Sequence, residues 1–261
     1  MAQNKIAVAG ATGRVGRHLV EVLTERGHDV VPMSRATGVD LITGDGLDEA
    51  LTGVDCVVDA ASGPSADEQE ATEFFTTAAR NLHEAGERAG VRQMVVVSII
   101  GIDQATGGYS AAKLVHEKAH LDGPIPARIL RAAQFHEFVG QLVDWGRQGD
   151  VAYVYKMRTQ LVAARTVAEA LADLATDAAG APVPPQTEPG TPFPEIAGPR
   201  EESLVEAARL LVARRGDDVE VVEVSDPANP DRELQESGAL LPGPHATLAG
   251  PTFEAWLDEI S

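Results

Sequence analysis

Short apolar runs alternate with longer amphipathic stretches along the first half of the chain. Short, mostly apolar runs with the length of a strand fall at residues 6–9, 28–33, 41–43, 54–61, 92–100 and 127–132, and the run at 92–100 has the continuous hydrophobicity of a strand buried on both faces. Helical patterns lie between them, the longest over residues 65–89, where Gly90 provides a C-terminal stop. This alternation predicts an α/β fold of the Rossmann type, a doubly wound parallel sheet with helices on both faces.

The pattern changes beyond Gly149, where the segments become shorter and do not repeat. Strands are expected at residues 151–155, 160–164, 193–197 and 219–224, and helices at 166–179, 200–215, 230–238 and 252–260. Thr166 and Glu169 have the spacing of a capping box, and prolines and glycines predict loops at 181–192 and 240–251. We therefore expect residues 1–150 to form the main domain and residues 151–261 a smaller lobe of the same unit.

Three glycines, Gly10, Gly13 and Gly16, separate the first predicted strand from the helix that follows it. A glycine turn between a strand and a helix N-terminus is the context in which this spacing binds a dinucleotide. Gly10 permits the turn, Gly13 lets the backbone approach a pyrophosphate, and Gly16 allows the helix to pack on the strand. Unpaired N–H groups and the helix dipole favour phosphate at this point. The first 150 residues are thus predicted to bind a dinucleotide, with Thr12, Arg14 and Val15 in the binding loop.

The residues after the second predicted strand indicate which dinucleotide is preferred. An NAD site usually carries an acidic residue about 20 positions after the glycines, but Ser34 and Arg35 stand at that place. A guanidinium binds a 2′-phosphate with two hydrogen bonds, and Arg14 would add a second positive charge. We therefore expect NADP(H) rather than NAD(H); two solvated arginines are the alternative. Further cofactor contacts are expected from residues at the ends of the next two strands, Asp45, Ala60, Ala61 and Ser62.

The composition narrows the classes of partner. Forty acidic residues against 21 basic ones give a formal net charge of −19 and a pI near 4.6. Such a surface repels phosphate backbones and anionic lipids, so we expect neither nucleic-acid nor membrane binding. Cys56 is the only cysteine, which excludes an internal disulfide framework. With no leader or long apolar run in the sequence, we expect a cytoplasmic protein, a monomer or small homo-oligomer acting on a small molecule.

Candidate catalytic residues follow the strand predicted at 92–100. Ser98 lies at the carboxyl end of that strand, and a glycine-rich loop leads to Tyr109 and Lys113 at the start of a helix. The last two are four residues apart and share one helical face. An ammonium group beside a phenol favours the phenolate, so Lys113 is expected to lower the pKa of Tyr109 and make it an acid–base catalyst. Ser98 would hold the reacting oxygen by a hydrogen bond.

Taken together, these residues resemble the short-chain dehydrogenase/reductase superfamily. The resemblance rests on Gly-Ala-Thr-Gly-x-x-Gly at 10–16, Ser98, Tyr109-x-x-x-Lys113 and Ile-Leu-Arg-Ala-Ala-Gln-Phe at 129–135, and it points to the atypical, NmrA-like NAD(P)-binding branch. It implies that Tyr109 exchanges the proton, that Lys113 holds the nicotinamide ribose, and that Ser98 orients the substrate. It also implies that Phe135, His136 and Phe138 line the substrate pocket, with core packing as the alternative for the two phenylalanines and a surface or capping role for His136.

One departure from that family concerns a fourth catalytic residue, an asparagine in the helix before the strand predicted at 92–100. Our register places Phe75 there, and Asn81 falls a turn and a half later.

A further motif, His116-Glu-Lys-Ala-His120, matches the His-Glu-x-x-His pattern of zinc metalloproteases. No third ligand follows in the sequence, so we expect no metal and a partly exposed helix surface.

Three functions remain in order of preference. The first is an NADP(H)-dependent oxidoreductase that passes hydride between nicotinamide and a small carbonyl, alcohol or quinone, with a Ser98-Tyr109-Lys113 triad. The second is an NmrA-like redox sensor that binds the dinucleotide, performs no chemistry and regulates a partner. The third is a sugar-nucleotide epimerase, which would hold NAD tightly and is disfavoured by Arg35.

Overall fold

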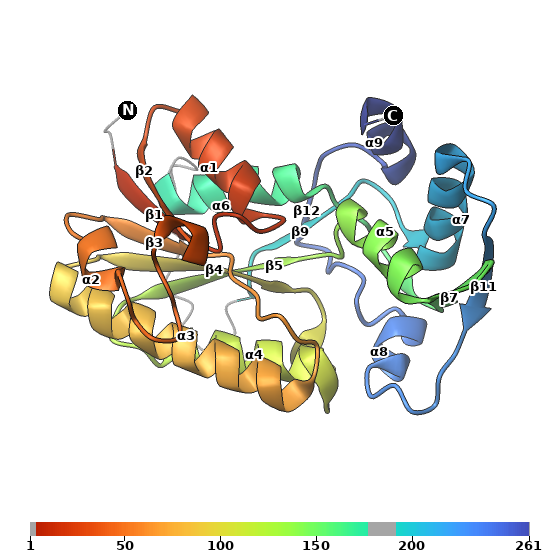
Figure 1. Ribbon diagram of the computed structural model, residues 1–261, viewed down its shortest axis with the longest axis horizontal. Helices are drawn as coiled ribbons and strands as arrows, with labels where there is room; N and C mark the ends of the chain where they lie inside the picture. The colour runs from red at the N-terminus through yellow and green to blue at the C-terminus, as the bar shows by residue number, and fades with distance from the viewer. Residues whose placement is uncertain (1–3, 177–191, 261) are drawn as a thin grey trace.

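The centre of the protein is a seven-stranded sheet whose strands all run parallel. The computed structural model describes residues 4–176 and 192–260 (Figure 1). The strand order is β12-β9-β5-β4-β3-β1-β2. The strands are β1 (Lys5–Ala9), β2 (Asp29–Met33), β3 (Cys56–Asp59), β4 (Gln93–Ile99), β5 (Ala127–Ala132), β9 (Glu195–Ala197) and β12 (Thr247–Leu248). The order reverses between the neighbouring strands β1 and β3, as in a doubly wound Rossmann-type sheet, which confirms the predicted fold class.

Helices cover both faces of this sheet (Figure 1). On one face α1 (Gly16–Glu25) and α6 (Ala164–Thr176) bury their apolar sides against alternate strand residues such as Ile6 and Val58. On the other face α3 (Glu68–Ala89) and α4 (Gly108–Leu121) lie side by side, with the short α2 (Leu47–Ala50) near the sheet edge. The central strands are buried on both faces, which explains their continuous hydrophobicity.

A smaller lobe packs beside the carboxyl ends of the strands (right of Figure 1). It has its own apolar cluster, formed by α5 (His136–Trp145), α7 (Leu204–Arg215), α9 (Phe253–Ile260) and the sheet β6-β7-β11. That sheet comprises β6 (Arg147–Gln148), β7 (Val151–Tyr155) and β11 (Glu220–Val224); β8 (Arg158–Thr159) pairs with β10 (Glu202–Ser203), and α8 (Arg232–Ser237) completes the lobe. Between these segments the chain returns to the main sheet through α6 and β9. The boundary near residue 150 stays a prediction.

Two predicted strands are wrong. Residues 41–43 form a turn, because Asp40 Oδ1 accepts hydrogen bonds from the amides of Ile42 (2.7 Å) and Thr43 (3.2 Å). The strand expected at 160–164 is reduced to a single bridge between Val162 and Phe135, and the regular pairing stops at Thr159. The stretch 160–164 is buried, so there the burial was predicted better than the backbone conformation, whereas in 41–43 only Leu41 is partly buried and Ile42 is 41% exposed.

Two predicted helix starts are also displaced. Helix α6 begins at Ala164, whose amide donates to the Glu137 carboxylate of α5, so Thr166 lies inside the first turn and is not a capping residue. Helix α7 begins at Leu204 rather than 200, with the Ser203 hydroxyl as its N-cap. The predicted loop 181–192 lies, apart from its last residue, outside the described residues.

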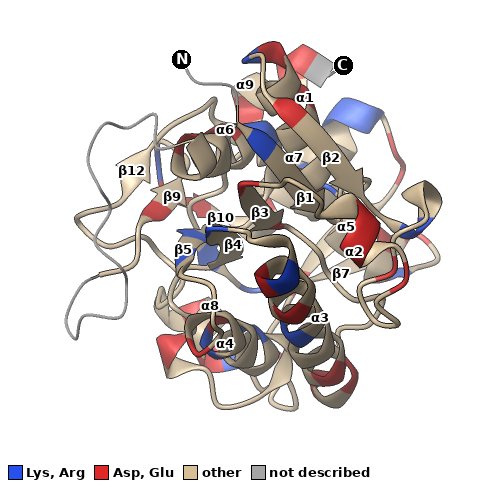
Figure 2. Cartoon of the chain, turned by 90° about the vertical axis from the view of Figure 1, so that its left-hand side faces the viewer, with Lys and Arg blue, Asp and Glu red and all other residues tan. Residues whose placement is uncertain are grey.

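The charged residues of the helices include many acidic ones, as the acidic composition predicts. Figure 2 shows acidic residues interleaved with basic ones along α3 and further acidic residues on other helices. Among the described helices, none is both long enough and apolar enough to cross a lipid bilayer.

Candidate active site

The glycine turn has the close approaches that its sequence predicts. Gly10 has φ +73°, and a Cβ there would lie 2.8 Å from the carbonyl oxygen of Ala60 at the end of β3. A Cβ on Gly16 would lie 2.1 Å from the carbonyl oxygen of Gly10. The Gly13 amide donates to that same Gly10 oxygen at 2.8 Å. Only glycine fits at the first and third positions, so strand, turn and helix pack as the sequence predicts.

The start of α1 is open to a ligand. Its N-cap is Val15, which is buried, and in the described chain no side chain caps this helix start. Thr12 and Gly13 are exposed in the turn. The unpaired N–H groups of a first helical turn, together with the helix dipole, attract phosphate. The turn therefore has the geometry of a pyrophosphate site.

Residues from the neighbouring strand ends meet this turn. Ala60 and Ala61 lie against Gly10, and the Ala61 amide donates to Asp59 Oδ1 at 2.9 Å. Ser62 is exposed just beyond them. The end of β2 is joined to the turn by a hydrogen bond from the Ala11 amide to the Met33 oxygen, 3.2 Å. The small residues at the end of β3 thus lie where a cofactor would pass.

The residues expected to bind a 2′-phosphate lie in different surroundings. Ser34 and Arg35 follow β2 directly, and Arg35 is exposed at the start of a short 3₁₀ turn, Arg35–Thr37. Arg14 instead faces α5, where its guanidinium donates to the Gln141 side chain and lies 5.6 Å from the Phe138 ring centroid. Burial lowers the pKa of Arg14. Asp45 lies exposed in the turn before α2. The cofactor roles of all four residues stay predictions.

Ser98 has an unsatisfied hydroxyl. It lies near the carboxyl end of β4, opposite Arg131 of β5, and is 2% exposed. Within the described part of the chain, its Oγ has no hydrogen-bond partner. A buried hydroxyl without a partner costs free energy, so such atoms in folded proteins call for an explanation. A substrate oxygen as partner would supply one.

Tyr109 is half-buried at the start of α4 and keeps its proton. Its ring packs edge-to-face on Phe75 of α3, with centroids 5.8 Å apart. Burial raises the pKa of Tyr109 to about 12, and the positive charge that opposes this rise is Arg14. The predicted lowering of this pKa by Lys113 is therefore wrong for the cofactor-free chain.

Lys113 lies one helical turn beyond Tyr109, as predicted, but its amine is directed into the protein interior. The residue is 5% exposed, and Nζ donates to the Val97 oxygen at 2.9 Å and to Nδ1 of His116 at 2.9 Å. The amine also lies 4.7 Å from the centroid of the Phe75 ring, which contacts Tyr109 as well. Burial lowers the pKa of Lys113 to about 8.

The predicted exposed surface at His116 and His120 is wrong, because both side chains are 0% exposed. Their Nε2 atoms each lie 3.1 Å from Oδ2 of Asp59 and 3.2 Å from one another. Nδ1 of His120 lies 3.2 Å from Nε2 of His83 on α3. Asp59 and His83 were missed by our sequence analysis; a carboxylate ending the otherwise apolar run Cys56–Asp59 was the available signal.

The residues expected to line the substrate pocket point in three directions. Phe135 packs on the sheet core, and Phe138 contacts Arg14 of the glycine turn. His136 is 1% exposed, bonds the Leu161 oxygen through Nε2 at 3.1 Å, and packs on Phe253 and Trp256 of the lobe. Burial lowers its pKa to about 4, and its Nδ1 has no partner among the described residues. His136 is thus a buried residue of the lobe rather than a surface histidine.

Helix α3 carries both Phe75 and Asn81, the two residues considered for the family's fourth catalytic position. Phe75 contacts Tyr109, Lys113 and His116, and its correspondence to the family's fourth catalytic residue stays a prediction. Asn81 donates instead to the backbone oxygens of Leu41 and Ile42, at 2.8 and 2.9 Å, and so holds the turn before α2. An aromatic ring therefore replaces the amide beside the candidate triad.

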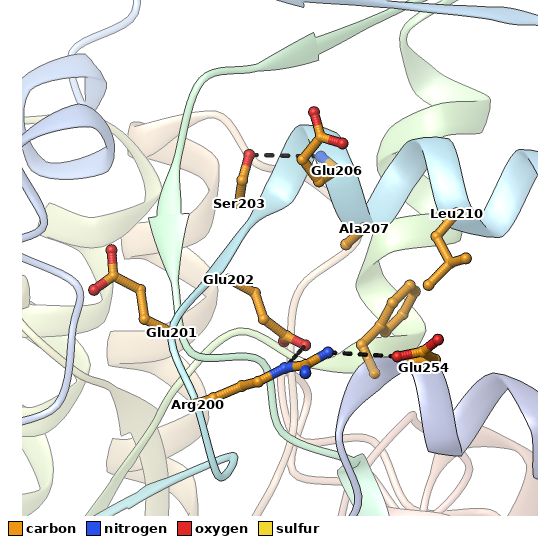
Figure 3. Close-up of a pocket in the computed structure, with 9 residues that line it drawn as sticks. Arg200, Glu201, Glu202, Ser203, Glu206, Ala207, Leu210 and Glu254 are labelled. Atoms are coloured by element: carbon orange, nitrogen blue, oxygen red, sulfur yellow. Dashed lines mark hydrogen bonds and ion pairs between the residues drawn. The ribbon is translucent and has the colours of Figure 1, made fainter.

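Two surface cavities lie in the smaller lobe. One, of about 390 Å³, is lined by Arg200, Glu202, Phe253 and Glu254 among others, with Arg200 paired to both carboxylates at 3.6 and 3.7 Å (Figure 3). The other, of about 360 Å³, includes His136, Arg214, Arg215 and Trp256. None of the three candidate catalytic residues lines either of these two cavities.

Comparison with known proteins agrees with the geometry of the glycine turn. Residues 10–123 match the protein family described as NAD(P)H-binding. Ceramide reductase of Caulobacter vibrioides is 30% identical over 133 residues, which cover 45% of this chain and 42% of that protein. The chain therefore spans less than half the length of this curated relative.

Solved structures resemble the chain over its whole length. The dTDP-4-dehydrorhamnose reductase of Bacillus anthracis, in complex with NADP, has a TM-score of 0.69 and 16% identity, covering 99% of this chain and 98% of that one. MoeE5 in complex with UDP-glucose and NAD has a TM-score of 0.68 and 19% identity, covering 98% and 96%. At such identities the likeness shows the fold. The match of residues 10–123 to an NAD(P)H-binding family agrees with the dinucleotide-binding domain predicted from the sequence.

Proposed function

We propose that the protein is an NADP(H)-dependent oxidoreductase that reduces a small carbonyl or quinone, with Tyr109 as proton donor and Ser98 as anchor of the substrate oxygen. The observation that carries the proposal is the unpartnered hydroxyl of Ser98, buried at the sheet edge where the glycine turn opens. Bound NADPH would supply hydride to the carbonyl carbon. Ligands of open α/β sheets bind at this edge.

The protonation state of Tyr109 favours reduction over oxidation. With a pKa of about 12 the phenol is protonated at neutral pH. A protonated phenol donates to a developing alkoxide, whereas removal of an alcohol proton needs the phenolate. The Ser98 hydroxyl stabilises the same oxygen as its charge grows.

The cofactor preference rests on charge. Arg35 is exposed directly after β2, where a 2′-phosphate would lie. The two solved structures described above carry NADP in one case and NAD in the other, so the choice depends on this chain's own residues. The acidic surface and the absence of a membrane-spanning pattern in the sequence support a cytoplasmic protein with a small-molecule substrate.

A redox sensor is the second candidate, favoured by one observation. The Lys113 amine is bonded to Val97 and His116, and among the described residues no hydrogen bond joins it to the Tyr109 hydroxyl. In that function the dinucleotide would bind and regulate a partner without turnover. An epimerase remains a weaker third candidate.

The decisive experiment measures NADPH binding and NADPH oxidation over a panel of carbonyls and quinones, for the wild type and Tyr109→Phe. The enzyme requires turnover by the wild type and its loss in the variant, with NADPH affinity unchanged. Tight NADPH binding by both proteins with no turnover of any panel member would instead support the sensor.

A further inference from the structure

A continuous chain of hydrogen bonds runs through the interior from Lys113 to His83. It passes from the amine of Lys113 to His116, from both α4 histidines to Asp59 of β3, and from His120 to His83 of α3, in steps of 2.9 to 3.2 Å. All five side chains are at most 5% exposed. The segment that resembled a zinc motif is thus part of the packing between α3, α4 and the sheet.

The proton positions in this chain follow from its end at Lys113. An ammonium only donates, so Nδ1 of His116 accepts and its Nε2–H donates to Asp59 Oδ2. Nε2–H of His120 donates to the same oxygen, and Nδ1 of His120 accepts from Nε2–H of His83. Nδ1 of His83 faces the Ile125 amide at 3.4 Å. Every member then has a partner, with one negative charge on Asp59 and one positive charge on Lys113; the two Nε2 atoms, 3.2 Å apart, both donate to Asp59 Oδ2 rather than to each other.

A metal ion fits this proton arrangement less well. Asp59, His116 and His120 do bring one oxygen and two nitrogens within 3.2 Å of one another. A cation bound by Nε2 of His116 would leave the proton on Nδ1, which already faces the amine of Lys113. The ammonium and that N–H would then both be donors. Hydrogen bonding gives the Lys113 amine a matched acceptor at His116, and its close donor–donor contact is the 3.2 Å between the two Nε2 atoms that share Asp59 Oδ2.

We propose that Asp59 and His116 are positioning residues that hold the Lys113 amine in its charged form, with His120 and His83 fixing the orientation of the two rings. The use of that charge in turnover rests on the proposed function; the hydrogen-bonded arrangement itself does not.

The charges around Lys113 support this assignment. Burial disfavours the ammonium, while the charges of Asp59 and Glu117 favour it and bring its pKa to about 8. Glu117 of α4 is itself engaged by Arg131 of β5 through two hydrogen bonds of 2.9 and 2.8 Å. The other titratable groups of this buried hydrogen-bonded chain are His83 of α3 and the two α4 histidines, and Tyr109 lies one helical turn away and keeps its proton. Burial and the Lys113 charge lower the pKa of His116 to about 3, so its ring is neutral. Asp59 is therefore the negative charge not committed to another cation.

The titration of Lys113 can be read directly, because Lys5, Lys113, Lys118 and Lys156 are the chain's only lysines. We would label the lysine side chains with ¹³C at Cε and follow their NMR shifts with pH in the full, cofactor-free chain. In the wild type the buried lysine, Lys113, should titrate near pH 8. Asp59→Asn should lower the Lys113 midpoint by at least about one pH unit, because the compensating charge is removed.

Two further variants complete the test. His116→Phe keeps the ring that stacks on Phe75 but removes the acceptor of the Lys113 amine, and it should lower the midpoint as well. Asp122→Asn is the matched control. It removes an exposed carboxylate at the C-terminal end of α4, and this carboxylate pairs with Lys118 at 2.6 Å. It should leave Lys113 unchanged. Circular dichroism reports whether each variant is folded, and His116→Phe carries the test if Asp59→Asn does not fold.

Unchanged Lys113 titration in a folded Asp59→Asn or His116→Phe protein would overturn the proposal. So would ¹⁵N spectra of the wild type with the His116 proton on Nδ1, or a stoichiometric metal found by elemental analysis. None of these readouts needs turnover, so they decide the proposal even if no substrate is reduced. If the panel does reveal turnover, its pH profile should shift with the measured Lys113 midpoint in each variant.

Discussion

Arg131 of β5 and Glu117 of α4 form a buried, two-pronged ion pair, with Nε–Oε1 at 2.9 Å and Nη2–Oε2 at 2.8 Å. Both side chains are at most 5% exposed, and the Arg131 guanidinium also bonds Asp103 and stacks on Phe193. This pair ties the helix that carries Tyr109 and Lys113 to the strand beside Ser98. The relative positions of the candidate catalytic groups therefore depend on it.

Glu117→Gln should destabilise the protein by about 3–5 kcal/mol, because it leaves a buried guanidinium without its main counter-charge. Urea unfolding at pH 7.5 measures this. Asp48→Asn is the control: it breaks the exposed pair with Arg88, which should change stability by about 1 kcal/mol or less. A similar small loss for both variants would show that the buried pair does not hold the layers together.

Gly16→Ala should weaken NADPH binding and lower stability. The new methyl group would lie 2.1 Å from the Gly10 oxygen, so α1 has to move away from the turn that holds the pyrophosphate. Gly27→Ala is the matched control, since a Cβ there meets nothing within 4 Å. Its positive φ of +83° alone should cost about 1–2 kcal/mol without affecting binding. Fluorescence titration with NADPH and thermal unfolding of both variants separate the two effects; equal affinities would contradict the assigned role of the turn.

Arg35→Ala tests the choice of cofactor. If the exposed guanidinium binds the 2′-phosphate, the variant should lose at least about tenfold in NADPH affinity, in line with the free energy of a charge-assisted pair. NADH affinity should stay within about twofold. Arg147→Ala removes an equally exposed arginine on β6 and is the control. Equal losses for the two cofactors would refute the preference for NADP(H).

The sequence predicted the sheet because its central strands are buried on both faces and so have an uninterrupted apolar pattern. It also predicted the glycine turn, where Gly10 and Gly16 are required by local backbone contacts. It failed where a distant partner decides the conformation. Residues 41–43 turn because of the Asp40 and Asn81 side chains, and helix α6 starts early because Glu137 of α5 caps it.

The orientation of the candidate catalytic groups was the hardest part to predict. The spacing of Tyr109 and Lys113 places them on one helical face but does not fix where the amine points. That direction is set by His116 and Asp59, which meet only because α4 packs on the end of β3. The same packing buries a motif that, by itself, is typical of a zinc site.

Acid should destabilise the protein through its buried histidines. Burial lowers the pKa of His83 and of His136 to about 4, below the value near 6.5 of an unfolded chain. The unfolded state then binds more protons between these values. The free energy of unfolding therefore has its full value, as far as these two histidines are concerned, above pH 6.5. It falls as the pH falls towards 4, by about 1.4 kcal/mol per pH unit for each histidine.

Urea unfolding between pH 8 and pH 5 measures this slope. His136→Gln should make the slope shallower by the share of one group, whatever it does to stability at pH 8. A stability that is flat down to pH 5 would show that the buried rings are not kept neutral by the fold.

Ser98→Ala separates a catalytic hydroxyl from a structural one. Because Oγ of Ser98 has no partner within the described chain, its removal should not lower stability and should raise it by up to about 1 kcal/mol. Ser110→Ala is the matched control, since that buried hydroxyl donates to Asp231 at 2.8 Å and its loss should cost about 1 kcal/mol. Turnover of any panel substrate should fall by about 10²-fold or more in Ser98→Ala, as when one donor to a developing oxyanion is removed, and stay near wild type in Ser110→Ala. A stability loss in Ser98→Ala with undiminished turnover would assign the hydroxyl to the fold and remove it from the proposed site.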